Sequence, residues 1–340
     1  VEILPKLKTV GAYAFSKCTA LELVSLPISL ETIENYAFEN CSGLKQLYIG
    51  NPEAEPMEAK ATIGAYAFTH CTALEYAALT SIVQVSGNNA FEYCTAMQTV
   101  YFAEGLTTIQ DKAFDYCTGL KALTFPNSLI TIGNMAFRHA EALKQIQFPT
   151  QLTTIGNASF QYCITLQDVT LPENITKLGN SAFSFCEGLT TLSVLGDVTQ
   201  WGNSTFYECQ KLTNIYIASA YSHYAEEENY VFYNAGIAGD GITLTIGKTA
   251  IIPECLFEPV DRLENFPNIT KIIVEDGATT VNAFLDYNYL PYLTEITMPD
   301  SVTSIPYGIF NVSPWWTAQE KGVVYIDNVF YGYKCECDYC

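Results

Sequence analysis

The sequence has little charge, and positive charge is what it lacks most. Only 15% of its 340 residues are charged, and 16 basic side chains stand against 36 acidic ones, which gives a formal net charge of −20. A field of that sign repels the phosphates of nucleic acids and the headgroups of anionic membranes. The composition therefore predicts that nucleic acid is not a partner.

Long apolar runs are also missing, although hydrophobic residues make up 49% of the chain. No run approaches the roughly 20 residues that span a membrane as a helix, so we expect no membrane insertion. The chain starts at Val1 with neither a basic nor an apolar leader, and the mature part of a secreted protein would start in the same way. The apolar share is large enough for a continuous buried core.

Catalytic motifs are absent as well. The chain has three histidines, no G-x-S-x-G nucleophile turn and no H-E-x-x-H pair. Gly247–Thr249 looks like the end of a phosphate-binding loop, but the first glycine of that motif would fall on Ile242, and Ile251–Pro253 follows in place of a helix. We therefore expect no enzyme, no catalytic residues, no cofactor and no bound metal.

One internal repeat organises most of the chain. An Ala-Phe pair or a close variant recurs, and seven of the eight intervals between its phenylalanines are 23 residues, while the eighth is 30. The longer interval contains Asn51–Lys60, whose prolines and glutamates indicate a solvent-exposed loop. The repeated phenylalanines, called the Phe column below, are Phe15, Phe38, Phe68, Phe91, Phe114, Phe137, Phe160, Phe183 and Phe206.

Each repeat predicts one strand and one helical turn. After the Phe column, apolar residues such as Leu120, Leu123 and Phe125 follow the spacing L-x-x-V-x-L, whose last two positions have the period of a strand. The Phe and Cys of Ala-Phe-x-x-Cys are three apart, as in a helical turn, and an asparagine such as Asn157 stands before it as a candidate cap. We therefore predict an α/β leucine-rich-repeat solenoid. It would be a curved stack of right-handed coils of about 23 residues, each with one short parallel strand and one short helical turn.

The full pattern I-G-N-x-A-F-x-x-C-x-x-L-x-x-V-x-L-P resembles the BspA-like (Treponema-type) leucine-rich repeats. Leu152–Cys163 and Ile175–Cys186 have its first half almost unbroken, and the match is close over residues 1–218. Known members of that family are mostly surface or secreted proteins of host-associated microbes and some protists, implicated in adhesion. The resemblance implies an extracellular or cell-surface protein. Gly322–Lys334 also resembles a short element found between repeat blocks, which fits a natural chain that continues past Cys340.

Three segments follow from the spacing. Residues 1–218 form the regular array, with the insertion near residues 51–60. Residues 219–313 continue the same solenoid irregularly, since Phe232, Phe257, Phe284 and Phe310 are 25 to 27 residues apart. Residues 314–340 form a C-terminal extension, which could begin a further element.

Eight cysteines stand three after the Phe column and form a column of their own. Rungs about 5 Å apart would permit disulfides, but we favour a buried ladder of reduced thiols, because Ala140 fills the same column. Cys335–Cys340 holds three further thiols with no fourth ligand, which favours a disulfide-rich continuation or a disordered end over a metal site. Of six N-x-S/T sequences, those at Asn157 and Asn203 belong to the capping column, which favours a structural role over glycan attachment.

Two surfaces are candidates for binding. The strands should line the concave side of the stack and point uncharged side chains and tyrosines outward, although Thr and Tyr also simply favour strands. A second stripe, two residues after the Phe column, should form an aromatic ladder that either stacks on itself or offers a flat platform. The concave-face candidates are Tyr48, Tyr76, Tyr101, Thr124, Gln147, Thr170 and Tyr216. The aromatic-stripe candidates are His70, Tyr93, Tyr116, His139, Tyr162 and Phe185.

The sequence thus favours a non-catalytic, adhesin-like module that recognises a host or cell-surface protein through one face of the solenoid. The first alternative is a structural spacer or assembly unit, which needs only the stack. The second is a carbohydrate-binding module, which depends on the aromatic stripe alone.

Overall fold

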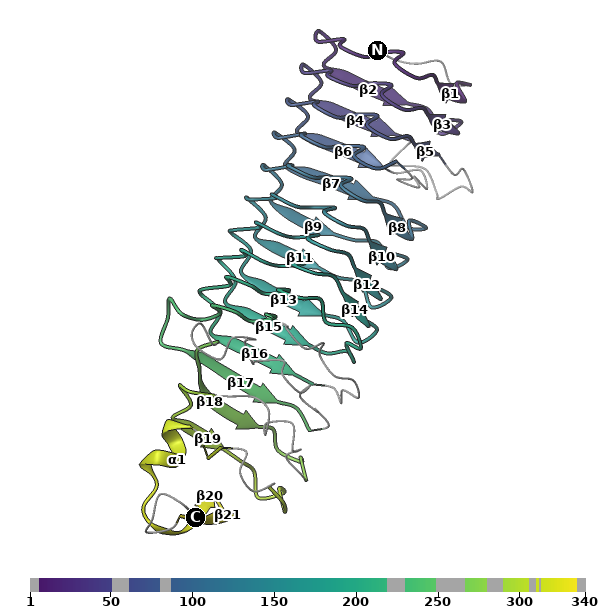
Figure 1. Cartoon of the computed structure of the whole chain (residues 1–340). Coiled ribbons are helices and arrows are strands. Elements are labelled where there is room, and N and C mark those ends of the chain that lie inside the picture. The colour runs from purple at the N-terminus through teal and green to yellow at the C-terminus, as the bar shows by residue number, and fades with distance from the viewer. Residues whose placement is uncertain are drawn as a thin grey trace.

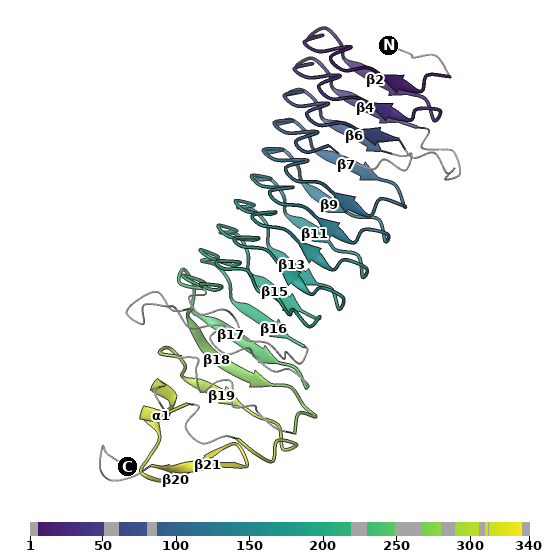
Figure 2. The same cartoon turned by 45° about the vertical axis from the view of Figure 1, so that its right-hand side comes forward.

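The computed structural model describes residues 6–50, 61–79, 87–218, 230–248, 267–279, 290–305, 310–311 and 313–334. The chain winds into coils that stack one on another into an elongated array, with the N-terminal coils at one end and the C-terminal segment at the other (Figures 1 and 2). The array is a leucine-rich-repeat solenoid, as the sequence predicts. It has little curvature in either view, so no deep concave side forms.

A main sheet of parallel strands runs the length of the stack (Figure 2). Neighbouring coils pair in register, so that residues in one column, such as Leu192 and Ile215, lie opposite each other. Hydrogen bonding divides the strands into three groups, β2 to β7, β9 with β11, and β13 to β19. The strands are β2 (Leu23–Leu26), β4 (Gln46–Ile49), β6 (Tyr76–Leu79), β7 (Thr99–Phe102), β9 (Ala122–Thr124), β11 (Gln145–Gln147), β13 (Asp168–Leu171), β15 (Thr191–Val194), β16 (Asn214–Ile217), β17 (Ile242–Ile246), β18 (Ile269–Val274) and β19 (Glu295–Thr297).

Among the described coils, seven contain a second strand that the sequence pattern does not predict. Each is two residues long, with a threonine or lysine turned partly outward and a buried apolar residue. Two residues are too few for alternation to be detected, so the period gives no signal. These strands are β1 (Thr9–Val10), β3 (Thr32–Ile33), β5 (Thr62–Ile63), β8 (Thr108–Ile109), β10 (Thr131–Ile132), β12 (Thr154–Ile155) and β14 (Lys177–Leu178).

The predicted helical turn is replaced by a run of tight turns around each Phe. In the coil of Phe137, Met135 and His139 have φ of 55° and 60°, a left-handed conformation that interrupts any right-handed helix. As a result, alternate amides point to different partners. Phe137 N donates to Ser159 O of the next coil at 2.8 Å, whereas Arg138 N donates back to Met135 O at 3.3 Å. The turns therefore join neighbouring coils as well as closing their own.

The asparagine column also bonds to the next coil and does not cap its own turn. Asn157 Oδ1 accepts from Asn180 N at 2.8 Å, and Asn180 Oδ1 accepts from Asn203 N at 2.9 Å. The glycine before Asn180 permits this close approach, since a Cβ on Gly179 would lie 2.3 Å from Asn157 N. The prediction that these asparagines cap their own turn is therefore wrong. Their side chains accept from the next coil and so link neighbouring coils.

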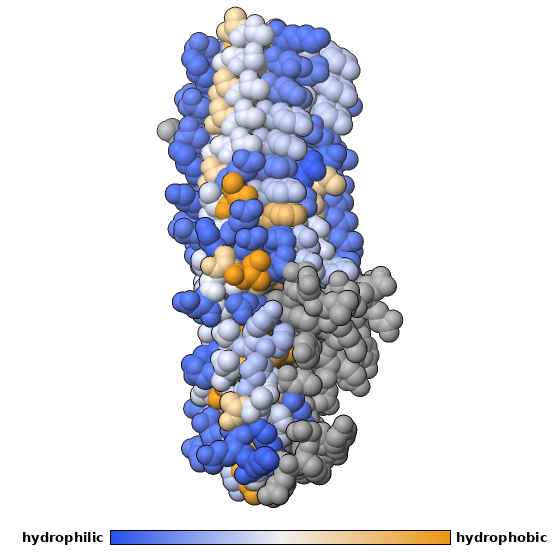
Figure 3. Space-filling model, turned by 60° about the vertical axis from the view of Figure 1, so that its left-hand side comes forward, coloured by the Kyte–Doolittle hydropathy of each residue, from blue (hydrophilic) through white to orange (hydrophobic). Residues whose placement is uncertain are grey.

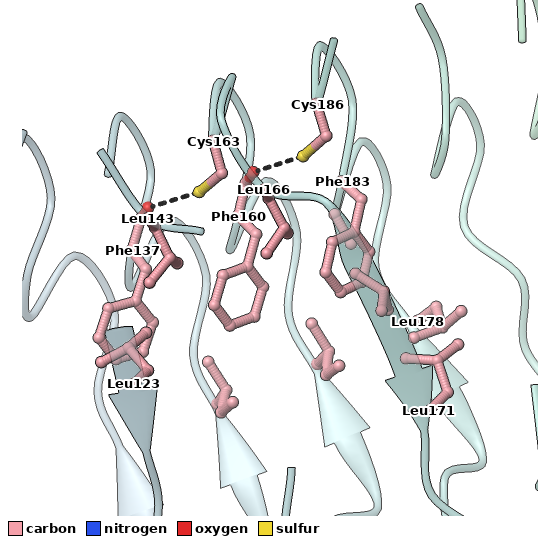
Figure 4. Close-up of a cluster of buried hydrophobic side chains, with 14 of the residues drawn as sticks. Leu123, Phe137, Leu143, Phe160, Cys163, Leu166, Leu171, Leu178, Phe183 and Cys186 are labelled. Atoms are coloured by element: carbon pink, nitrogen blue, oxygen red, sulfur yellow. Dashed lines mark hydrogen bonds between the residues drawn. The ribbon is translucent and has the colours of Figure 1, made fainter. Parts of the chain in front are cut away.

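The core is one continuous apolar cluster with the Phe column at its centre (Figure 4). The rings stack from coil to coil with centroids 4.9 to 5.4 Å apart. Phe15, at the end of the stack, is partly buried, and the later rings of the column are fully buried. Because each coil from Phe15 to Phe232 contributes the same ring at the same height, burial is distributed evenly along this part of the array.

The cysteine column is reduced, as predicted. Seven of its eight thiols are buried, and only Cys18, in the first coil, is exposed. Each buried Sγ donates to the carbonyl of the Phe-column residue one coil earlier, for example Cys163 to Phe137 O at 3.5 Å and Cys186 to Phe160 O at 3.3 Å (Figure 4). Burial raises the pKa of the Cys186 thiol to about 12 and holds the pKa of Cys163 well above its ordinary value.

The C-terminal segment ends the array with a different structure. Helix α1 (Pro314–Ala318) begins at Ser313, whose Oγ accepts from Trp316 N at 3.2 Å. An antiparallel hairpin of β20 (Gly322–Ile326) and β21 (Val329–Lys334) follows. Lys334 Nζ donates to three carbonyls around the end of α1, those of Trp316, Thr317 and Gln319, which ties the hairpin to the helix.

Replacing one Phe-column ring should destabilise the array far more than replacing a surface residue. Phe137→Ala removes a fully buried ring and should lower the free energy of unfolding by roughly 3–5 kcal/mol. Lys144→Ala changes an exposed side chain and should stay within about 0.5 kcal/mol of the unchanged protein. Urea unfolding measures both, and equal midpoints for the two variants would mean that the core is assigned to the wrong column.

The thiol column should make stability fall at alkaline pH. An unfolded thiol loses its proton near pH 8.5, about three to four units below the folded value for Cys186. Below that pH both states hold the proton, and above it only the folded state does, so stability is lost as pH rises toward the folded pKa. Each thiol whose pKa burial raises in this way, such as Cys163 and Cys186, should cost about 1.4 kcal/mol per pH unit in this window.

Urea midpoints at pH 7.5 and 9.5 test this expectation. Cys163→Ala, which copies the natural Ala140, should reduce the difference between the two midpoints by one thiol's share. A thiol reagent should label Cys18 in the folded protein and the seven buried cysteines only after unfolding. An unchanged midpoint difference in Cys163→Ala would contradict the assignment of the shift to the thiols.

Candidate functional site

The outward side chains of the main sheet, called the main-sheet face below, include all seven predicted sheet residues. Tyr101 on β7 is 54% exposed, and Thr124, Gln147 and Thr170 on β9, β11 and β13 are exposed as well. Tyr48 on β4, Tyr76 on β6 and Tyr216 on β16 are half-buried. Alternation along the strands explains this placement, because the residue that follows each of them, such as Ala77 after Tyr76, is turned toward the core.

Three of the seven gather on neighbouring coils and are called the tyrosine cluster below. The rings of Tyr48 and Tyr76 are in contact, with centroids 5.6 Å apart and planes at 45°. Tyr48 and Tyr101 share one row of the sheet and flank Ala78, whose side chain is 1% exposed. The cluster therefore presents two packed rings and one more exposed ring from three adjacent strands.

Tyr216 lies apart from the tyrosine cluster, several strands further along the stack (Figure 1). Its hydroxyl donates to Glu275 Oε2 at 3.5 Å, and burial together with the Glu275 carboxylate raises the pKa of Tyr216 above its ordinary value. The phenol therefore stays neutral over a wide pH range and remains a hydrogen-bond donor. Thr124, Gln147 and Thr170 lie on the strands between, so the candidates form an extended row rather than one compact site.

The aromatic stripe stacks on itself from end to end. Successive ring centroids from His70 to Phe185 are 4.3 to 4.7 Å apart, and the planes lie within 30° of parallel. The interior rings, such as Tyr116 and His139, therefore have both faces covered and present only their edges. Arg138 adds a cation 5.4 Å from the Tyr116 ring centre. This geometry favours the self-stacking interpretation over the flat platform.

A further aromatic stack lies two residues before the Phe column. The rings of Tyr13 and Tyr36, and those of Tyr36 and Tyr66, are stacked with centroids 5.0 Å apart. All three residues have φ near 60°, like the residues of the aromatic stripe. The sequence signal for this stack is the presence of three tyrosines in one column.

The described residues form neither a metal-binding group nor a membrane-spanning helix. Within them, no group of three or more His, Cys, Asp or Glu side chains is arranged to hold a metal ion. No helix of the described segments has the length and hydropathy that crossing a membrane requires. Thr249 and Cys335–Cys340, which completed two of the motifs considered above, lie outside the described residues. The surface in Figure 3 is mainly hydrophilic, with like side chains in columns along the stack.

Comparison with known proteins identifies the repeat. A family model described as BspA type leucine rich repeat region, in six copies, matches residues 1–121, 107–238, 229–315 and 259–331. A search of curated proteins gives no match. The chain is thus covered by the family model along nearly its whole length.

Three solved leucine-rich-repeat structures are similar to this chain, and the first of them shares its fold. A leucine-rich repeat protein from Bacteroides ovatus matches with a TM-score of 0.53 and 21% identity, over 88% of this chain and 79% of that one. A leucine rich cell surface protein from Faecalibacterium prausnitzii gives a TM-score of 0.42 at 21% identity, over 90% and 80% of the two chains. A leucine-rich repeat protein from T. pallidum gives 0.40 at 23% identity, over 56% and 78%.

Proposed function

The chain belongs to the BspA-type leucine-rich-repeat family, and we propose that it is a secreted or cell-surface module that binds a protein through its main-sheet face. Leucine-rich-repeat proteins are typically binding modules and generally non-catalytic. The proposed role is adhesin-like, with a host or cell-surface protein as the partner. It rests on family membership for the class of activity and on the tyrosine cluster for the site.

The tyrosine cluster is the observation that supports this site most strongly. Tyrosine offers a large apolar area and a polar tip while losing little side-chain entropy on binding. Here the strands beneath Tyr48, Tyr76 and Tyr101 are paired in register, so the rings are held on a rigid base. A partner that buries them would meet a preorganised surface, which reduces the entropic cost of association.

The alternative functions have less support. A sugar would stack on an open ring face, and the interior rings of the aromatic stripe have both faces covered by their neighbours. A spacer requires only the stacked coils and gives no reason for exposed aromatic side chains on one sheet. The net charge of −20 would also oppose close assembly of identical chains at low salt.

The proposal predicts that binding depends on the tyrosine cluster. Immobilised protein and a Tyr76→Ala/Tyr101→Ala variant are compared as baits for a host-cell surface extract, and proteins lost with the variant are purified. For such a protein, each substitution should weaken binding by more than about 1 kcal/mol, roughly fivefold in Kd. The urea midpoint of the variant should stay close to that of the unchanged protein, because Tyr101 is largely exposed and Tyr76 half-buried.

Controls separate this outcome from the alternatives. Lys211→Ala changes an exposed residue and should leave the affinity unchanged. Anchoring by aromatic rings should also depend little on salt, whereas diffuse electrostatic attraction would weaken steeply. A protein that binds the double variant unchanged at low and high salt would place the site elsewhere, with the aromatic stripe as the next surface to test. Binding on a glycan array, or filaments in light scattering, would favour one of the other functions.

A further inference from the structure

An ion pair between a buried carboxylate and a partly exposed guanidinium joins two coils near the middle of the stack. Asp115 stands one residue after Phe114, and its side chain is fully buried. Arg138, in the same position one coil later, donates from Nε to Oδ1 at 3.0 Å and from Nη2 to Oδ2 at 2.7 Å. The guanidinium also lies over the Tyr116 ring. The bidentate contact satisfies both carboxylate oxygens inside the array.

The rest of the interior gives each coil almost the same neighbour. The Phe column, the cysteine column and the leucines after it repeat from coil to coil, so coils could exchange neighbours with little loss of apolar burial. Such exchange, by skipping a coil or by swapping coils between chains, is a known hazard of repeat proteins. An array this uniform therefore needs features that distinguish one coil from another.

The residues one after each phenylalanine, from Ser16 to Tyr233, form a column whose residue type varies from coil to coil; we call it the register column. Its contacts differ from pair to pair, with Ser16 Oγ donating to Glu39 at 3.1 Å and Gln161 donating to Ser184 Oγ at 3.0 Å. Arg138 is the only basic residue in this column. Asp115 therefore contacts a cation from this column only when the coil of Arg138 stacks directly on the coil of Asp115.

The ion pair joins the two coils whose main-sheet strands form an isolated hydrogen-bonded pair. Strands β9 and β11 belong to the coils of Asp115 and Arg138, and they pair only with each other. The strands on either side, β7 and β13, belong to separate hydrogen-bonded groups. Each of the two central strands is three residues long, shorter than most of the others. The main sheet thus bonds these two coils to each other through short strands and does not bond either of them to the coils beyond.

We propose that Asp115 and Arg138 act as a register pin, which determines during folding that their two coils stack directly on each other. Any other neighbour would leave the Asp115 carboxylate buried without a cation, and an unpaired buried charge is strongly unfavourable. The pair's role is then specificity of stacking rather than net stability. In coiled coils, charged pairs set the choice of partner and a buried polar residue fixes the register.

The first experiment separates specificity from stability. Asp115→Leu/Arg138→Met replaces the pair with apolar side chains of similar size, which is expected to leave the urea midpoint unchanged or raised. After refolding from urea with reductant present, the yield of native monomer should nevertheless fall severalfold, with oligomers or misfolded monomer in its place. Gln161→Ala, in the same column, is the matched control and should refold like the unchanged protein. A variant with unchanged yield would overturn the proposal.

The second experiment moves the cation by one coil. Arg138→Gln leaves Asp115 unpaired, and Arg138→Gln/Gln161→Arg offers it a cation one coil too far along. If the pin selects the register, the double variant should give more misstacked protein than the single one, with the skipped coil around Phe137 open to limited proteolysis. A double variant that refolds no worse than Arg138→Gln would overturn the proposal. Gln161→Arg alone keeps Arg138 in place and should refold normally.

Discussion

The spacing between coils is the constraint on which the rest of the structure depends. Parallel strands lie about 4.8 Å apart, and every group that bridges two coils must fit that distance. The Phe column meets it with stacked rings 4.9 to 5.4 Å apart, and the thiols meet it with bonds to the preceding coil. Asparagine side chains reach the next coil's amide over the same step. One translation therefore explains the aromatic, thiol and amide ladders together.

The sequence predicts what the repeat period determines and misses what depends on the backbone within a coil. The columns and the strand after Leu120 follow from 23-residue spacing and alternation. The left-handed φ of His139 or Tyr162 could not be predicted, because bulky side chains seldom adopt that conformation and no glycine marks the position. It is stabilised here by bonds to the neighbouring coil, such as His139 N to Gln161 O at 2.9 Å.

The candidate site shows the same division. Period-two alternation was sufficient to place Tyr48, Tyr76 and Tyr101 on the outer side of adjacent strands. Alternation does not specify rotamers, so it could not show that Tyr76 packs on Tyr48 rather than beside Tyr101. Alternation also could not predict contacts between segments that are distant in sequence, such as the contact between Tyr216 and Glu275, which are 59 residues apart.

Uniform columns and variable columns have different tasks in such an array. A column that repeats gives every coil the same energy and so cannot distinguish one coil, or one partner, from another. Only a column whose residues vary can distinguish one coil, or one partner, from another. On the outside that is the main-sheet face, where Tyr101 gives way to Thr124 and then to Gln147. On the inside it is the register column, where Asp115 and Arg138 differ from every other pair. Recognition of a partner and recognition of the correct coil thus draw on the same property of the sequence, its departures from the repeat.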